Sequence, residues 1–292
     1  MSFQMFTRAA NGQLRPAAAE QFVFPAGEQH LKFGALADLA GDQVAYLRGA
    51  AAEGLVALHM WADAVRAAGG TPRALIPYLP GARADRGVPF GARVYADMIN
   101  AARLAQVVCF DPHSPVMPAL IDNVTVVSAA PLIAATLAYS QISAPGFGRI
   151  RRGPIAGVIA PDAGAKARAS EIADLLGVPL FQAAKHRDPD TGQLSGFTCE
   201  PLPITGNMLV ADDICDGGGT FLGLADSTGL PADRLTLWVS HGVFSAGADR
   251  LPERFGTVVA TDSISPATGY HADITIPLRF HLEQHLTFGD HS

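Results

Sequence analysis

Residues 208–221 read MLVADDICDGGGTF and carry the most specific pattern of the sequence. The apolar run 208–211 predicts a buried strand, and two adjacent carboxylates, Asp212 and Asp213, follow it directly. Three consecutive glycines then lead to Thr220, where the pattern predicts the start of a helix. A buried strand that passes through a glycine-rich loop into a helix is typical of an α/β fold.

The loop of this segment has the chemistry of a phosphate site. Consecutive glycines let backbone N–H groups turn inward around a phosphate, and the N-terminus of the following helix adds partial positive charge. Asp212 and Asp213 would be repelled by a phosphate unless they bind a ribose diol or a metal ion. The segment therefore predicts a sugar-phosphate clamp, with a structural strand-to-helix turn as the alternative. The residues expected to hold the phosphorylated sugar are Asp212, Asp213, Asp216, Gly217, Gly218, Gly219 and Thr220.

Short apolar runs alternate with Ala/Leu-rich segments of helical spacing on both sides of this clamp. Strands are expected over 44–47, 73–78, 106–110, 155–160, 208–211, 235–240 and 257–261. Helices are expected over 55–68, 94–104, 166–176 and 219–226. Strands that are apolar on both faces and separated by helices predict parallel sheets covered on both sides.

The length of 292 residues and the two alternating series favour two similar α/β domains over one very large sheet. The segment 143–153, SAPGFGRIRRG, concentrates Pro, Gly and Arg and predicts the boundary. We therefore expect an N-terminal domain over 1–145 and a C-terminal domain over 146–292. Between Asp122 and Arg149 the chain has no charge, which a buried strand and helix explain better than a membrane span.

The composition excludes several classes of protein. With 49% hydrophobic and 16% charged residues, the chain can bury a core and is not disordered. The net charge of −6 argues against a nucleic-acid partner. The three cysteines show neither paired nor zinc-finger spacing, and the N-terminus lacks a signal peptide, so a reduced cytoplasmic protein with no membrane partner is expected.

The stretch VADDICDGGGTF resembles the phosphoribosyl-diphosphate loop of the type I phosphoribosyltransferase fold. From about residue 24 to about residue 263, the order of the motifs is similar to that of the ribose-phosphate diphosphokinases (PRPP synthases). The further motifs are FPAGE at 24–28, PYLPGARADR at 77–86, CFDPHS at 109–114, APDAGAKAR at 160–168, AKHR at 184–187 and SHGVFS at 240–245. Several motifs in the same order are far more specific than any one of them.

This resemblance implies two phosphoribosyltransferase-like domains, each a mostly parallel sheet flanked by helices. It implies transfer of the β,γ-diphosphate of Mg-ATP to the C1 hydroxyl of ribose 5-phosphate, which gives PRPP and AMP. The catalytic residues would be Lys185 and Arg187, on a polar segment (185–196) expected to be a flap and neither helix nor central strand. The residues implied to bind ATP are Phe24, Glu28, Arg83, Asp85 and His113, and those implied to bind Mg²⁺ are His113 and Asp162. The family also implies a homo-oligomer, a dimer or a hexamer, with the nucleotide site near a subunit interface.

The sequence departs from the family pattern at Gly217 and Gly218, where the family has small residues other than glycine, and at two further places. Ala26 stands where the family has an acid, and the segment after Arg86 is shorter and lacks lysines. Two other functions share the clamp: a phosphoribosyltransferase that consumes PRPP, and a non-catalytic regulatory subunit of PRPP synthase. The two-domain length argues against the first, and the presence of Lys185 and Arg187 argues against the second.

Overall fold

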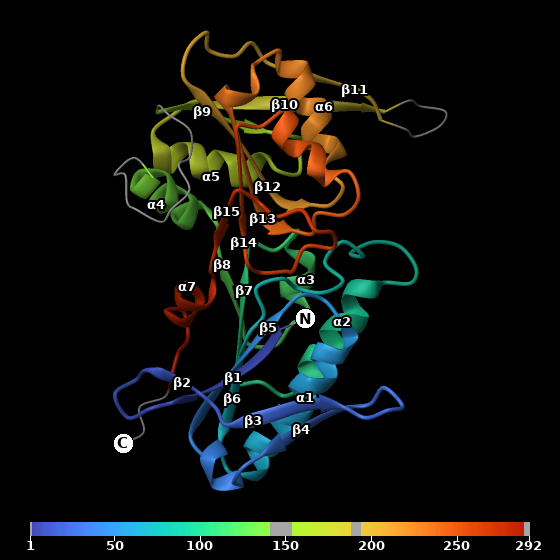
Figure 1. Cartoon of the computed structure of the whole chain (residues 1–292), viewed down its shortest axis with the longest axis vertical. Helices are drawn as coiled ribbons and strands as arrows, with labels where there is room; N and C mark the ends of the chain where they lie inside the picture. The colour runs from blue at the N-terminus through green and yellow to red at the C-terminus, as the bar shows by residue number, and fades with distance from the viewer. Residues whose placement is uncertain (1, 141–153, 188–193, 289–292) are drawn as a thin grey trace. The chain divides into compact units, whose positions relative to one another are not determined.

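The computed structural model describes residues 2–140, 154–187 and 194–288 (Figure 1). Its backbone contacts divide the chain into two compact units, Met1–Val127 with Pro277–Ser292, and Ser128–Ile276. The division falls before the expected boundary at 145–146, because helix α4 (Ala130–Ser140) packs on α5 (Lys166–Leu176) of the second unit. The last residues of the chain belong to the first unit, which the sequence pattern did not indicate.

The first unit is built on a six-stranded sheet with strand order β2-β1-β5-β6-β7-β8. The four strands β5 to β8 are parallel, and β1 and β2 extend one edge antiparallel. A separate hairpin pairs β3 with β4. The strand bounds are β1 Ser2–Arg8, β2 Leu14–Pro16, β3 Ala19–Val23, β4 Gln29–Phe33, β5 Asp42–Arg48, β6 Thr71–Leu75, β7 Gln106–Phe110 and β8 Val124–Val127. The helices are α1 Ala52–Ala67, α2 Gly91–Ala101, α3 Val116–Ala119 and α7 Arg279–Glu283, with a 3-10 turn at Leu36–Leu39.

The core of the first unit forms where α1 lies against the sheet. Leu58, Trp61, Ala62 and Val65 are fully buried on one stripe of this helix, as the spacing of the sequence predicts. They pack in one hydrophobic cluster with side chains of the strands, among them Ala74. Burial of such a stripe is the main source of stability for a helix of this kind.

The second unit is built on a seven-stranded sheet with strand order β11-β10-β9-β12-β13-β14-β15. All neighbouring strands are parallel except the edge pair β10 and β11. The strand bounds are β9 Ile155–Ala160, β10 Leu180–Arg187, β11 Leu194–Cys199, β12 Asn207–Cys215, β13 Leu235–Gly242, β14 Thr257–Thr261 and β15 Ile274–Ile276. Besides α4 and α5, the unit contains α6 Gly219–Thr228 and 3-10 turns at Ala232–Arg234 and Ala248–Glu253.

The predicted alternation of strands and helices is confirmed, and so are two mostly parallel sheets flanked by helices. The bounds of β7, β9, α5 and β14 coincide with the predicted ranges. The described part of the uncharged stretch after Asp122 forms β8 and α4, so the expected strand and helix are present. The expectation that this strand is buried is wrong, because Val126 is 49% exposed and only Val127 of β8 is buried. Among the helices that the structure describes, none combines the length and the apolar character needed to cross a membrane.

Candidate functional site

The carboxylate pair of the clamp lies on β12. This strand continues to Cys215, so the prediction that it ends at residue 211 is wrong. The extension has a physical cause: β13 runs parallel beside β12 as far as Gly242 and keeps the backbone of Asp212 paired in register with Val239. Asp212 and Asp213 are therefore held within a strand and do not lie on a loop.

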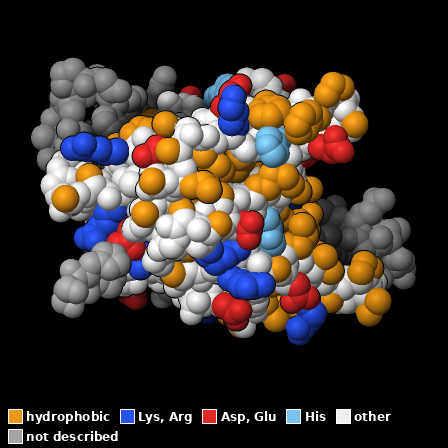
Figure 2. All heavy atoms as spheres, turned by 90° about the horizontal axis from the view of Figure 1, so that it is seen from below, with side chains coloured by type: hydrophobic (Ala, Val, Ile, Leu, Met, Phe, Trp, Pro, Cys, Tyr) orange, Lys and Arg blue, Asp and Glu red, His pale blue; other side chains and the backbone are white. Residues whose placement is uncertain are grey.

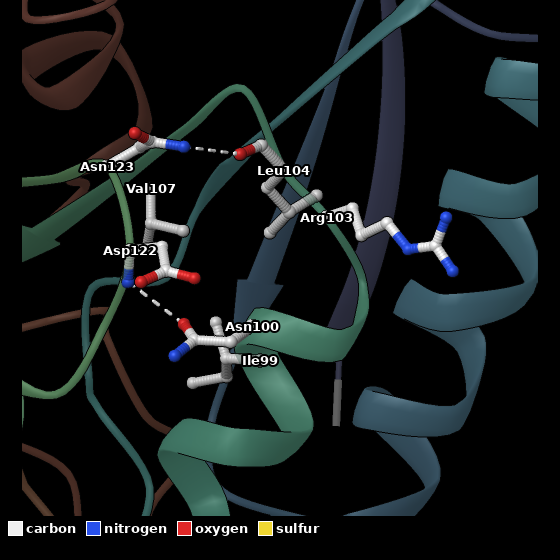
Figure 3. Close-up of a pocket in the computed structure, with 7 residues that line it drawn as sticks. All are labelled: Ile99, Asn100, Arg103, Leu104, Val107, Asp122 and Asn123. Atoms are coloured by element: carbon white, nitrogen blue, oxygen red, sulfur yellow. Dashed lines mark hydrogen bonds between the residues drawn. The ribbon is translucent and has the colours of Figure 1, made fainter.

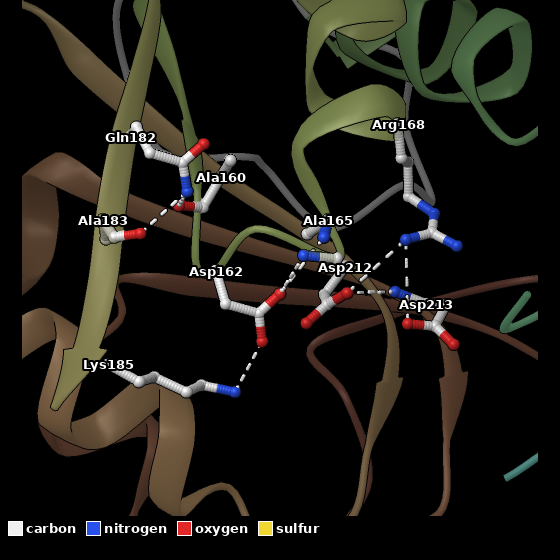
Figure 4. A network of polar contacts seen from close by, with 10 residues as sticks. Ala160, Asp162, Ala165, Arg168, Gln182, Ala183, Lys185, Asp212 and Asp213 are labelled. Atoms are coloured by element: carbon white, nitrogen blue, oxygen red, sulfur yellow. Dashed lines mark hydrogen bonds and ion pairs between the residues drawn. The ribbon is translucent and has the colours of Figure 1, made fainter. Parts of the chain in front are cut away.

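A single arginine of α5 bridges the two carboxylates (Figure 4). Nη1 of Arg168 lies 3.5 Å from Oδ1 of Asp212 and 3.7 Å from Oδ1 of Asp213, and the side chains are 7% to 14% exposed. The backbone N–H of Asp213 donates to Oδ1 of Asp212 over 2.9 Å. Burial raises the pKa of Asp212 well above its usual value, and the charge of Asp213 raises it further, while Arg168 opposes both effects.

The glycine loop after β12 presents unused backbone donors. Gly218 has φ +78° and forms the N-cap of α6, a conformation that glycine adopts without strain. The amide N–H groups of Gly217, Gly219 and Thr220 donate no hydrogen bond to any residue within the described part of the chain. No atom lies within 4 Å of a Cβ placed on Gly219, so the space beside it is open. The loop therefore has open backbone donors at a helix N-terminus, the arrangement that suits an anion.

This loop is fixed from one side by the segment that follows β13. Val243 N–H donates to the carbonyl of Cys215 over 2.9 Å, and Ser245 N–H donates to the carbonyl of Asp216 over 3.2 Å. A Cβ on Gly217 would lie only 3.0 Å from the carbonyl oxygen of Ala246. The motif SHGVFS thus supports the loop, because its backbone packs directly beneath the glycines.

Lys185 is held by a third acidic residue near the site, Asp162. Its Nζ lies 2.6 Å from Oδ2 of Asp162, whose Oδ1 accepts the N–H groups of Gly164 and Ala165 over 2.9 and 3.1 Å (Figure 4). Burial alone would raise the pKa of Asp162. The hydrogen bond and the charge of Lys185, together with these two amides, lower the pKa below its usual value.

The segment 185–196 was expected to be a flap that forms neither a helix nor a central strand, and its two described ends belong to strands at the edge of the sheet. Lys185 pairs with Phe197 across an antiparallel ribbon of β10 and β11 at the edge of the sheet. Polar residues form a strand here because an edge strand needs only one paired neighbour and no apolar face. The side chain of Arg187, and residues 188–193 entirely, lie outside what the structure describes.

Arg168 is the residue of this site that the sequence did not single out. It ends the motif at 160–168, but its contact with β12 depends on α5 packing against β9 and β12, which only the fold reveals. The structure thus brings together Asp162 with Lys185, and Arg168 with Asp212 and Asp213, at the carboxyl ends of neighbouring parallel strands. Ligands bind at this end in open α/β sheets.

The predicted nucleotide residues lie in the first unit. Oδ2 of Asp85 accepts a hydrogen bond from Ser114 Oγ over 2.7 Å, so the motifs at 77–86 and 109–114 meet after β6 and β7. Arg86 Nε lies 3.8 Å from Oδ1 of Asp85. Arg83 and His113 are exposed. The structure therefore joins two of the predicted motifs through one hydrogen bond.

Phe24 and Glu28 lie at the turn that joins β3 to β4. These two strands form a separate two-stranded sheet. The N–H of Phe24 donates to the carbonyl of Glu28 over 2.8 Å and closes the turn. The Phe24 ring is 45% exposed, and it contacts Phe22 at 5.1 Å and His30 at 5.5 Å between centroids. An exposed ring on a hairpin turn has a free face for stacking.

The first unit also contains a cavity that the predicted residues do not line. Its volume is about 280 Å³, and it lies between the end of α2 and the starts of β7 and β8 (Figure 3). Asn100 donates to the carbonyl of Leu120 and accepts the N–H of Asp122, and Asn123 donates to the carbonyl of Leu104. The amides that line the cavity are therefore already used by the fold.

Two observations bear on other ligands. On the face of Figure 2, Lys and Arg side chains are interspersed with Asp, Glu and apolar ones. Among the described residues, no group of three or more His, Cys, Asp or Glu side chains could by itself hold a metal ion.

Comparison with known proteins agrees with the motifs. No family model matches the chain. It is 29% identical over 209 residues to a ribose-phosphate pyrophosphokinase of Bradyrhizobium diazoefficiens, a match that covers 66% of this chain and 60% of that protein. A ribose-phosphate pyrophosphokinase of Mesorhizobium japonicum is 30% identical over 206 residues, which cover 67% of this chain and 62% of the relative. The chain thus spans less than two thirds of the length of these relatives.

Among solved structures, a phosphoribosylpyrophosphate synthetase from Mycobacterium smegmatis has a similar fold. The TM-score is 0.72 at 21% sequence identity, and the match covers 92% of this chain and 89% of that chain. The resemblance expected from the motifs is therefore confirmed: the chain is similar in sequence to ribose-phosphate pyrophosphokinases and has the fold of a phosphoribosylpyrophosphate synthetase.

Proposed function

We propose that this protein is a ribose-phosphate diphosphokinase, which makes PRPP and AMP from Mg-ATP and ribose 5-phosphate. The observation that carries the proposal is the loop after β12, where unused amides at a helix N-terminus directly follow two buried carboxylates. This combination suits a phosphorylated pentose, since the amides bind an anion and the carboxylates bind hydroxyl groups. Similarity to curated ribose-phosphate pyrophosphokinases supports the same substrate.

In this proposal the second unit binds ribose 5-phosphate. The backbone from Asp216 to Thr220 holds the 5-phosphate, and the Thr220 hydroxyl donates to it as well. Asp212 and Asp213 accept hydrogen bonds from the ribose hydroxyls. Binding through fixed backbone donors costs little reorganisation, because the loop is already supported by the residues after β13.

The first unit supplies most of the proposed nucleotide contacts. Phe24 stacks on the adenine, and Glu28, Arg83 and Asp85 bind the remainder of the nucleotide. Arginine suits a polyphosphate because its planar fork binds two oxygens at once. We further propose a homo-oligomer, a dimer or a hexamer, with this nucleotide site near a subunit interface, and a place in nucleotide biosynthesis in the cytoplasm.

The side chains of this site suit a magnesium ion that enters bound to the nucleotide. Mg²⁺ is usually bound by one or two protein ligands, with water and substrate phosphates completing its octahedron. The carboxylate of Asp162 is a hard oxygen donor of this type, and His113 would orient the metal-bound phosphates. When bound, the ion neutralises phosphate charge and polarises the transferring group.

The proposed transfer is a direct displacement. The C1 hydroxyl oxygen of ribose 5-phosphate attacks the β-phosphorus of ATP and loses its proton. The bond from the β-phosphorus to the oxygen that bridges it to the α-phosphorus breaks, and AMP leaves with that oxygen. Lys185 and Arg187 stabilise the charge that develops on the transferring group, so the protein acts by positioning and electrostatics.

The test is product identification with the pure protein. With Mg²⁺, ribose 5-phosphate and ATP, ³¹P NMR should show AMP and PRPP in equal amounts, and omission of ribose 5-phosphate should abolish both. The same incubation with other nucleoside triphosphates ranks the diphosphate donors. A protein that binds both substrates and forms neither product contradicts the proposal. Release of diphosphate from PRPP that requires a nucleobase and no ATP would instead identify a PRPP-consuming transferase.

A further inference from the structure

Arg168 occupies a position that is unfavourable for a cation. It is the third residue of α5, within the first turn, where the helix dipole is positive. Its side chain is only 13% exposed, so water does little to compensate. A buried charge persists only where it is paired, and the pairs here are the carboxylates of Asp212 and Asp213 at 3.5 and 3.7 Å.

We propose that Arg168 is a positioning residue of the ribose-phosphate site, whose guanidinium holds the carboxylates of Asp212 and Asp213 where they bind the ribose hydroxyls. This inference rests on the function proposed above. Arg168 contacts the carboxylates and not the reacting atoms, so it acts through them. Both contacts are made by one nitrogen, Nη1, to the Oδ1 atom of each aspartate.

The need for such a cation follows from the pair itself. Two carboxylates lie on consecutive positions of a strand, with little contact with water. Loss of water raises the pKa of Asp212, and repulsion by the charge of Asp213 raises it further. A carboxyl group that takes up a proton loses part of its capacity to accept hydrogen bonds from a diol. The Arg168 guanidinium opposes this protonation, and the N–H of Asp213 adds a second donor to Oδ1 of Asp212.

The segment that leads into α5 also contacts Lys185, the proposed catalytic lysine. Asp162, which accepts the Gly164 and Ala165 amides and pairs with Lys185, lies just before α5. Arg168 follows on the first turn of that helix. The segment 162–168 therefore contacts the proposed catalytic lysine through Asp162 and the proposed diol-binding carboxylates through Arg168. The hydrogen-bonded turn before α5 fixes the backbone from which the Arg168 side chain extends.

The test compares Arg168→Met and Arg168→Lys with the wild type. Arg254→Met is the matched control, since Arg254 also belongs to the second unit and pairs with Asp226 at 3.0 Å, away from the carboxylate pair. Calorimetry gives the Kd of ribose 5-phosphate, kinetics give KM for each substrate, and urea unfolding gives stability. Loss of a charge-assisted contact predicts a Kd and KM for ribose 5-phosphate raised about tenfold or more in Arg168→Met, with KM for ATP nearly unchanged.

Two further results are expected if Arg168 acts through the carboxylates. Arg168→Lys should recover part of the affinity, because an ammonium restores the charge but not the shape of the fork. In an Asp212→Asn background, which removes the repulsion, Arg168→Met should weaken binding less than it does in the wild type. Arg254→Met should bind ribose 5-phosphate as the wild type does.

The inference is overturned if Arg168→Met binds ribose 5-phosphate as the wild type does, or if its affinities for both substrates fall together with stability. A wild type that forms no product but binds ribose 5-phosphate contradicts the proposed function alone, and the Kd values still decide the role of Arg168. A wild type that does not bind ribose 5-phosphate overturns both proposals.

Discussion

The ion pair between Asp162 and Lys185 can be tested by the substitution Asp162→Asn. The asparagine keeps a carbonyl Oδ1 that can accept the N–H groups of Gly164 and Ala165, so the turn before α5 should persist. What is lost is the charge facing Lys185 Nζ at 2.6 Å. The substitution therefore isolates the ion pair from the turn.

The expected loss of stability is small and depends on pH. The two side chains are 21% and 31% exposed, and partly exposed pairs contribute about 1 kcal/mol or less. Because folding lowers the pKa of Asp162, this contribution is present above the unfolded pKa of about 4 and is lost as the pH falls through the lower folded value. The unfolding free energies of variant and wild type should thus differ by about 1 kcal/mol at pH 7 and converge below about pH 4.

The assay is urea unfolding from pH 8 to pH 3, with steady-state kinetics at pH 7.5. Asp174→Asn is the control, because Asp174 is an exposed aspartate of α5, and its variant should stay within about 0.5 kcal/mol of the wild type. KM for Mg-ATP should rise about tenfold in Asp162→Asn, with KM for ribose 5-phosphate unchanged. A stability difference that persists undiminished at pH 3, or an unchanged KM for Mg-ATP, would refute this reasoning.

Four other substitutions test the proposed catalytic lysine, the glycine loop and an ion pair of the first unit. Lys185→Ala should lower kcat about a hundredfold and leave the cooperative unfolding transition intact, which stopped-flow kinetics and urea titration measure. Gly218→Ala should lower the free energy of unfolding in urea by about 1–2 kcal/mol, because φ is +78° and Leu251 lies 3.1 Å from the new Cβ. Gly219→Ala, whose new Cβ lies in open space, should change this free energy by less than about 0.5 kcal/mol. Arg73→Ala removes an ion pair of the buried Asp42, which also contacts Arg8, and should lower the midpoint of thermal unfolding, with a loss of about 3 kcal/mol. An unchanged midpoint would show that this pair does not stabilise the first unit.

The central strands could be predicted from the sequence because burial dictates their composition. The strands β7 and β14 are buried along their whole length, and the ranges predicted around their apolar runs have the same bounds as the strands. The edge elements could not be predicted in this way. β10 carries Lys185 at its end and β11 pairs only with β10, so neither has an uninterrupted apolar run.

The candidate site, too, could be predicted only where its features are local in sequence. The glycine loop and its acids are local in sequence, so their chemistry could be inferred from residues 208–221 alone. The end of β12 was misplaced because pairing with β13, a tertiary effect, extends the strand through Asp213. Arg168 was missed for a related reason: the carboxylates that it contacts lie more than forty residues away along the chain, and only the packing of α5 brings them together.

The central claim is that the amides after β12 hold the phosphate of a phosphorylated pentose. The most direct measurement is an NMR titration of the backbone N–H groups with ribose 5-phosphate, followed at Gly217, Gly219 and Thr220. These resonances should shift and saturate together, while that of Gly229, the C-cap glycine of the same helix, should not move. Saturable binding of ribose 5-phosphate that leaves the three loop amides unshifted would contradict the claim, as would an absence of binding.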